Sequence, residues 1–216
     1  MLDKRRLSRV IEKMTTDCLL ITDPISIAYL CGKKIEPGER FLGLLIGKEI
    51  EPVLILNQLF RFSDELGIKI EYYKDIDRIT NIISRFIDKK SSLGVDKIMP
   101  ARFLISMMEE KIASEFKLGS YAVDHTRAVK DACEQELMRA ASHINDLAMA
   151  EFKKLIHEGV TEVEVASQML GIYQRLGASG YSFEPIVAFG KNAADPHHMP
   201  DDTVLHGGDT VLSDVG

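Results

Sequence analysis

Short apolar runs typical of strands alternate with apolar residues at helical spacing along the first half of the chain, and this alternation restricts the possible folds. Apolar runs of strand length lie at residues 18–22, 41–47, 52–57 and 92–96. A chain that switches repeatedly between the two periodicities builds a mixed sheet covered by helices. We therefore predict an α/β domain over residues 1–122.

Apolar residues at helical spacing predict three helices in this domain. The three stripes run from Leu7 to Met14, from Ile76 to Ile87 and from Leu104 to Ile112. The runs at 41–47 and 52–57 are separated only by a short polar stretch, so we expect them to be neighbouring strands that pair.

The pattern changes between Gly119 and Ala132, where polar and charged residues gather, and we predict a second domain over residues 123–216. An apolar stripe from Leu137 to Leu155 predicts the longest helix of the chain. The sequence Thr161-Glu162-Val163-Glu164 has the form of a capping box, which predicts the start of another helix that ends at Gly177.

Composition excludes several classes of partner. The formal net charge is −6 and no cluster of Lys and Arg stands out, so we expect no nucleic-acid partner. The three cysteines, Cys18, Cys31 and Cys133, form no CxxC pair, which fits a reducing cytoplasm. The sequence has neither a signal-peptide pattern nor an apolar run long enough to span a bilayer, so we expect no membrane association.

The residues best suited to catalysis lie near the end of the sequence, in a loop between strands predicted at residues 185–189 and 210–212. His197 and His198 are followed by Asp201 and Asp202. Their imidazole and carboxylate groups either converge on one pocket or belong to a solvated surface loop.

Asp214 follows the apolar pair Val211-Leu212 by two residues, so a strand there would end by presenting a carboxylate. Such an oxygen ligand suits a hard metal ion, although an aspartate in an ordinary turn has the same pattern.

Two segments near the end of the chain resemble the motifs of one enzyme family. Residues 190–197 read GKNAADPH and residues 208–216 read GDTVLSDVG. They resemble the Gly-x-Asn-(Ala/Gly)-Ala-x-x-His and Gly-Asp-x-(Val/Leu)-x-x-Asp-x-Gly segments of Xaa-Pro dipeptidases (prolidases) and aminopeptidases P. The resemblance is continuous from Arg127 to Gly216. Residues 26–32, SIAYLCG, are more loosely similar to the creatinase-like N-terminal domain of that family.

The resemblance implies a fold and a site. The fold would be an α/β N-terminal creatinase-like domain followed by an incomplete α+β pita-bread domain. His197 would be the active-site histidine that stabilises the tetrahedral intermediate, and Asp214 the first ligand of a centre of two divalent metal ions, Mn or Co, or Zn. No role transfers to His198. The remaining ligands of the family, an aspartate, a histidine and two glutamates, have no counterpart up to Gly216. We therefore expect the chain to be truncated, metal-free and inactive as it stands.

The resemblance also implies an activity for the full-length protein. It would be a metallopeptidase that removes the N-terminal residue from Xaa-Pro dipeptides or peptides, a cytoplasmic homodimer acting on substrates with proline at the second position. A creatinase-like hydrolase and a non-catalytic binding or dimerisation protein are the alternatives. Many members of that family have a small or hydroxyl residue at the position of Phe189. The Phe189 ring would either fill the core or line the pocket.

Overall fold

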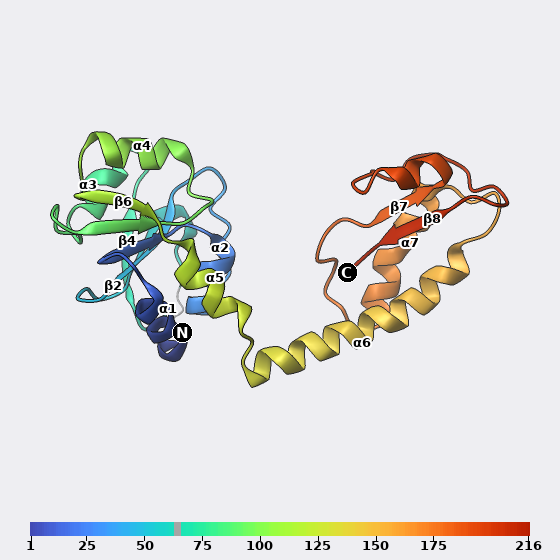
Figure 1. Ribbon diagram of the computed structural model, residues 1–216, viewed down its shortest axis with the longest axis horizontal. Coiled ribbons are helices and arrows are strands. Elements are labelled where there is room, and N and C mark those ends of the chain that lie inside the picture. Colours follow the sequence, from blue (N-terminus) through green and yellow to red (C-terminus); the bar gives the residue numbers. More distant parts are fainter. Residues whose placement is uncertain (63–65) are drawn as a thin grey trace. The chain divides into compact units, whose positions relative to one another are not determined.

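The computed structural model describes residues 1–62 and 66–216 and consists of two compact units, Met1–Val129 and Lys130–Gly216 (Figure 1). The first unit includes helix α5 (Ser120–Ala128), which packs against α1 (Lys4–Lys13). The domain boundary expected from the sequence after residue 122 stays a prediction. No helix in these two ranges is both long and apolar enough to cross a membrane.

A six-stranded mixed sheet forms the centre of the first unit, in the order β4-β3-β2-β1-β5-β6. The pairs β1–β2 and β2–β3 are antiparallel, and the other three pairs are parallel. The strands are β1 (Cys18–Ile21), β2 (Leu42–Gly47), β3 (Val53–Asn57), β4 (Lys69–Tyr73), β5 (Ser92–Val95) and β6 (Glu115–Leu118).

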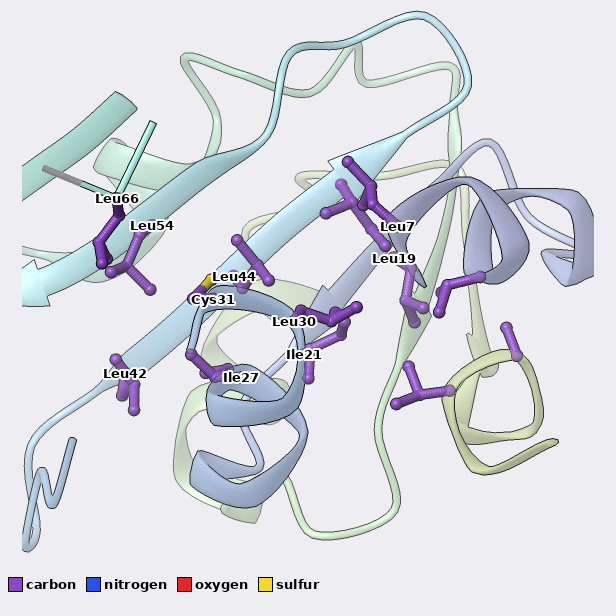
Figure 2. Close-up of a cluster of buried hydrophobic side chains, with 14 of the residues drawn as sticks. Leu7, Leu19, Ile21, Ile27, Leu30, Cys31, Leu42, Leu44, Leu54 and Leu66 are labelled. Atoms are coloured by element: carbon purple, nitrogen blue, oxygen red, sulfur yellow. The ribbon is translucent and has the colours of Figure 1, made fainter. Parts of the chain in front are cut away.

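Both faces of this sheet are covered by helices, and the side chains of β1 alternate between two hydrophobic cores. Leu19 and Ile21 pack with residues of α1, α2 (Pro24–Cys31) and α5, as Figure 2 shows for part of this core. Cys18 and Leu20 point to the opposite face, where α3 (Ile79–Ile83) and α4 (Ala101–Glu109) lie. Because neither face of the strand meets water, its sequence is continuously apolar.

The strands predicted at residues 18–22, 41–47, 52–57 and 92–96 are confirmed, and β2 and β3 pair as expected. The helical stripe from Ile76 to Ile87 is longer than the helix found there. α3 covers only Ile79–Ile83, and Ile76 is 87% exposed. The chain first makes a turn closed by the backbone bond from Asp77 N–H to the Lys74 carbonyl.

Helix α2 is absent from the sequence prediction because its signal is short and nearly all its residues are apolar. The Asp23 carboxylate accepts hydrogen bonds from the amides of Ile25 and Ser26 and so caps the helix, and Pro24 occupies its first position. Asp23-Pro24 therefore starts a helix where the sequence suggests only a turn that ends the preceding strand.

The second unit packs two helices against a two-stranded antiparallel ribbon (Figure 1). Its elements are α6 (Ala132–Leu155), α7 (Glu162–Arg175), β7 (Ile186–Phe189), a 3₁₀ turn at Gly190–Ala194 and β8 (Val211–Asp214). With 24 residues, α6 is the longest helix in the described ranges, as predicted. The predicted capping box of Thr161 and Glu164 at the start of α7 is also confirmed.

The core of the second unit uses only part of the predicted stripe on α6. Ala148 and Phe152 are buried, whereas Leu137 is 70% exposed. Phe189 is fully buried in the same core as Phe152 and Met169. The interpretation that Phe189 fills the core is therefore confirmed.

We predict that Leu44→Ala lowers the free energy of unfolding of the first unit by about 2–5 kcal/mol, because it leaves a cavity beside fully buried neighbours. The matched change Leu59→Ala, at a side chain 64% exposed, should alter it by less than about 0.5 kcal/mol. Urea unfolding followed by the NMR methyl signals of Ile21 and Ile55 measures both. Equal effects of the two variants would contradict this account of the core.

Candidate functional site

The loop between β7 and β8 carries the candidate histidines, and backbone hydrogen bonds fasten its far end to the segment that enters α7. Leu205 N–H donates to the carbonyl of Val160 at 2.9 Å, and Glu162 N–H donates to the carbonyl of Thr203 at 3.2 Å. An antiparallel bridge between Thr161 and Val204 lies between these bonds. The loop is thus fixed to the start of a helix.

A single buried carboxylate fastens the rest of this loop. Glu162 is 0% exposed, and its side chain accepts four hydrogen bonds. Oε1 accepts from the Phe189 backbone amide at 2.7 Å and from Asn192 Nδ2 at 3.0 Å. Oε2 accepts from the Asp201 backbone amide at 3.0 Å and contacts His198 Nε2 at 2.7 Å.

The chemistry of these partners makes Glu162 an acceptor on both oxygens. Two backbone amides and a side-chain amide can only donate, and a carboxylate without water must find its hydrogen bonds inside the protein. His198 therefore donates from Nε2, which fixes its tautomer and turns its ring inward, with the side chain 16% exposed. From the sequence, His198 was given no role and Glu162 was not predicted to belong to the site.

His197 has different surroundings from His198. Its backbone amide donates to the Asp195 carboxylate at 2.9 Å, and the amide of His198 donates to the Asp195 carbonyl at 3.2 Å. The imidazole of His197 is exposed and makes no hydrogen bond or ion pair with any residue that the structure describes. The loop thus turns His198 inward and leaves His197 available to a ligand.

Asp214 is the last residue of β8, as the sequence predicted, and it is exposed opposite Ile186. Within the described ranges its carboxylate has no hydrogen-bond or ion-pair partner, so both oxygens can accept a ligand. That fits the oxygen preference of a hard divalent cation, although Asp214 supplies only one of several ligands such an ion needs. The loop of His197 leaves the ribbon at its other end, where Phe189 pairs with Val211, and no hydrogen bond or ion pair joins His197 to Asp214.

The two candidate acids after the histidines behave differently. Asp201 joins the network around Glu162, with its Oδ2 3.9 Å from His198 Nε2, whereas Asp202 is exposed and has no partner in the described chain. The ligand atoms of Glu162, His198 and Asp201 lie within 4.8 Å of one another. The N–H donors already occupy the Glu162 oxygens, so this trio fits a hydrogen-bond network better than a cation site.

Hydrogen bonds from neighbouring threonines lower the pKa of two carboxylates near the start of α7. Hydrogen bonds from the hydroxyl and the backbone amide of Thr203 lower the pKa of Asp201 below its ordinary value. The backbone amide and the hydroxyl of Thr161 do the same to the pKa of Glu164, the acid of the capping box. Both groups therefore favour a folded second unit in which they are ionised.

Each of the two units matches a known protein family. The Creatinase/Prolidase N-terminal domain matches residues 4–129, and metallopeptidase family M24 matches residues 136–216. The chain belongs to the family defined by the Creatinase/Prolidase N-terminal domain. The predicted fold class, a creatinase-like α/β domain followed by part of an α+β pita-bread domain, is thereby confirmed.

Relatives of this creatinase/prolidase family member match nearly its whole length. An uncharacterized peptidase of Staphylococcus aureus (strain USA300) is 28% identical over 98% of the chain and 61% of its own length. The dipeptidase PepE from Mycobacterium ulcerans is 26% identical with a TM-score of 0.87, over 98% of this chain and 59% of its own. A dipeptidase from Pyrococcus horikoshii OT3 is 27% identical with a TM-score of 0.82. The match covers 98% of this chain and 61% of the dipeptidase. The chain therefore spans about three fifths of these relatives.

We predict that lowering the pH from about 5 to 3 destabilises the second unit, because a carboxylate with a depressed folded-state pKa stabilises the protein only while it is ionised. The contribution of Asp201 is present above the pKa of the unfolded chain and is lost as the pH falls through the folded-state pKa. Asp201→Asn should therefore show a shallower loss of stability than the wild type.

The control for this experiment is Asp202→Asn, which changes the neighbouring exposed carboxylate and should keep the wild-type pH dependence. Urea unfolding at each pH, followed by the NMR methyl signals of Val165 and Val187, measures the second unit alone. A wild-type pH dependence in Asp201→Asn would show that its bonds to Thr203 do not stabilise the fold.

Proposed function

We propose that the complete protein is a metallopeptidase that removes the N-terminal residue from Xaa-Pro dipeptides or from peptides with proline at the second position. The observation that carries this proposal is the loop of the M24 unit, which fixes His198 inward on Glu162 and leaves the His197 imidazole exposed and unpaired in the described structure. The similarity to a dipeptidase and to a prolidase from Pyrococcus horikoshii OT3 supports the same substrate class.

His197 and Asp214 would have separate roles in the reaction. The His197 imidazole would donate a hydrogen bond to the oxygen that becomes negative when the scissile carbonyl is attacked. Asp214 would be one ligand of a pair of divalent ions, manganese, cobalt or zinc. Such ions, when bound, polarise a carbonyl and supply a nucleophilic water at neutral pH.

Assembly and location form part of the proposal. We propose a homodimer in the cytoplasm. Cys18, Cys31 and Cys133 are free thiols, and burial raises the pKa of Cys31 to about 11. Free, protonated thiols are stable in a reducing compartment, which supports that location.

The test is hydrolysis of an Ala-Pro dipeptide and of an Xaa-Pro-Pro tripeptide with added manganese, by the product of the complete reading frame. We predict cleavage of at least one, and the preferred substrate separates a dipeptidase from an aminopeptidase. The 216-residue chain should cleave neither, because Asp214 alone cannot hold two ions. Two bound metal ions without cleavage would contradict the substrate class and favour a creatinase-like hydrolase.

Variants of the active product test the assigned residues. His197→Ala should lower kcat by about 100- to 1,000-fold, the usual cost of losing one oxyanion donor, with metal content unchanged. Asp214→Asn should lower the metal content measured by atomic absorption. The matched control His143→Ala, at an exposed histidine on α6, should do neither. Full activity in His197→Ala would refute its role.

A further inference from the structure

The buried carboxylate of Glu162 draws its hydrogen bonds from the end of β7 and from the loop that follows it, and so constrains the conformation of that loop. The four partners of Glu162 are Phe189, Asn192, His198 and Asp201, so they lie on both sides of His197 in the sequence. The bonds span the end of β7, the 3₁₀ turn and the segment that follows the histidines. The position of the His197 backbone is therefore set by contacts made to Glu162.

We infer that Glu162 is a positioning residue for His197 and that it acts mainly through the Nε2–H of His198. This inference rests on the proposed function, because it gives Glu162 a role in presenting the histidine that would stabilise the reaction intermediate. Glu162 itself is 0% exposed, so its effect on a substrate would be transmitted through other residues.

The arrangement couples the two histidines through the backbone they share. The ring of His198 is held at 2.7 Å from Glu162 Oε2, and its amide donates to the carbonyl of Asp195. The side chain of Asp195 accepts from the amide of His197. With one ring and two successive amides fixed, the direction of the His197 side chain from the backbone is fixed as well.

A glutamate at position 162 is needed for this network because only a carboxylate has a hydrogen-bond acceptor at both terminal atoms of the side chain. A glutamine of the same shape would present an NH₂ group to two N–H donors, either Phe189 and Asn192 or His198 and Asp201. One pair of donors would then lose its acceptor inside the protein, which costs stability and releases that part of the loop. Misplacing a catalytic group by about 1 Å can lower a rate about 100-fold.

The first arm of the test is NMR of the histidine rings in the 216-residue chain. We expect His198 to carry a proton on Nε2 whose exchange with solvent is at least about tenfold slower than that of the exposed His197. Glu162→Gln should abolish this protection and shift the ring and amide signals of His197. The matched control Glu164→Gln, at an exposed glutamate bonded to Thr161, should leave both histidines unchanged.

The second arm is kinetic and uses the product of the complete reading frame. Glu162→Gln should lower kcat by about 10- to 100-fold with KM changed by less than about threefold. In a His197→Ala background the same change should cost less than about threefold, because a residue that acts through His197 has no further effect once that ring is gone. A general structural defect would lower activity in both backgrounds.

The outcomes separate this inference from the proposed function. If the complete product cleaves no prolyl peptide, the proposed function fails, and the NMR arm still decides the role of Glu162. If Glu162→Gln does not fold, His198→Leu, which has no side-chain N–H to donate, removes one of the four bonds and should by itself shift the His197 signals. Unshifted His197 signals in the folded variant, or an equal kinetic loss with and without His197, would overturn the inference.

Discussion

A carboxylate with no access to water must find its hydrogen bonds within the protein. In the second unit, Glu162 accepts one from the end of β7 and three from the loop that follows. The loop has little apolar surface to hold it in place, since most of its residues are exposed or half-buried. Its conformation therefore depends on Glu162 and on the backbone bonds at Leu205 and Thr203. The different surroundings of His197 and His198 follow from this single requirement.

The first unit is built on a different constraint, the burial of a sheet on both faces. Apart from Asn57 at the end of β3, strands β1, β2 and β3 carry no polar side chain, because their apolar side chains enter one core or the other. Such a sheet is specified by hydrophobic burial, whereas the loop of the second unit is specified by hydrogen bonds. The chain thus combines a domain organised by packing with a site organised by polar contacts.

This difference explains what could be predicted from the sequence. The strand at 18–22 and the long helix with Phe152 were predictable because hydrophobic periodicity reports burial directly. Strands β4 and β6 were missed because their residues are mostly half-buried or exposed, and β6 lies at the edge of the sheet. Glu162 was missed because a glutamate in the first turn of a helix is ordinary in sequence, and only the fold brings His198 to it.

His197 and Asp214 were predicted as site residues from the resemblance, and the structure shows how the surroundings of His197 and His198 differ. Because the two histidines are adjacent, fixing the ring of His198 inward on Glu162 leaves His197 exposed on the outside of the loop. Asp214 at the end of β8 follows from the strand pattern alone, whereas its role as a metal ligand remains a proposal based on the family.

The measurement that tests this account most directly is the crystal structure of the complete reading-frame product with manganese and an uncleaved Xaa-Pro peptide analogue, using anomalous scattering to locate the metal. The account predicts a manganese ion within about 2.5 Å of an Asp214 oxygen and a hydrogen bond from the His197 imidazole to the analogue, with His198 still bonded to Glu162. Manganese bound instead among Glu162, His198 and Asp201, or a peptide analogue without contact to His197, would contradict it.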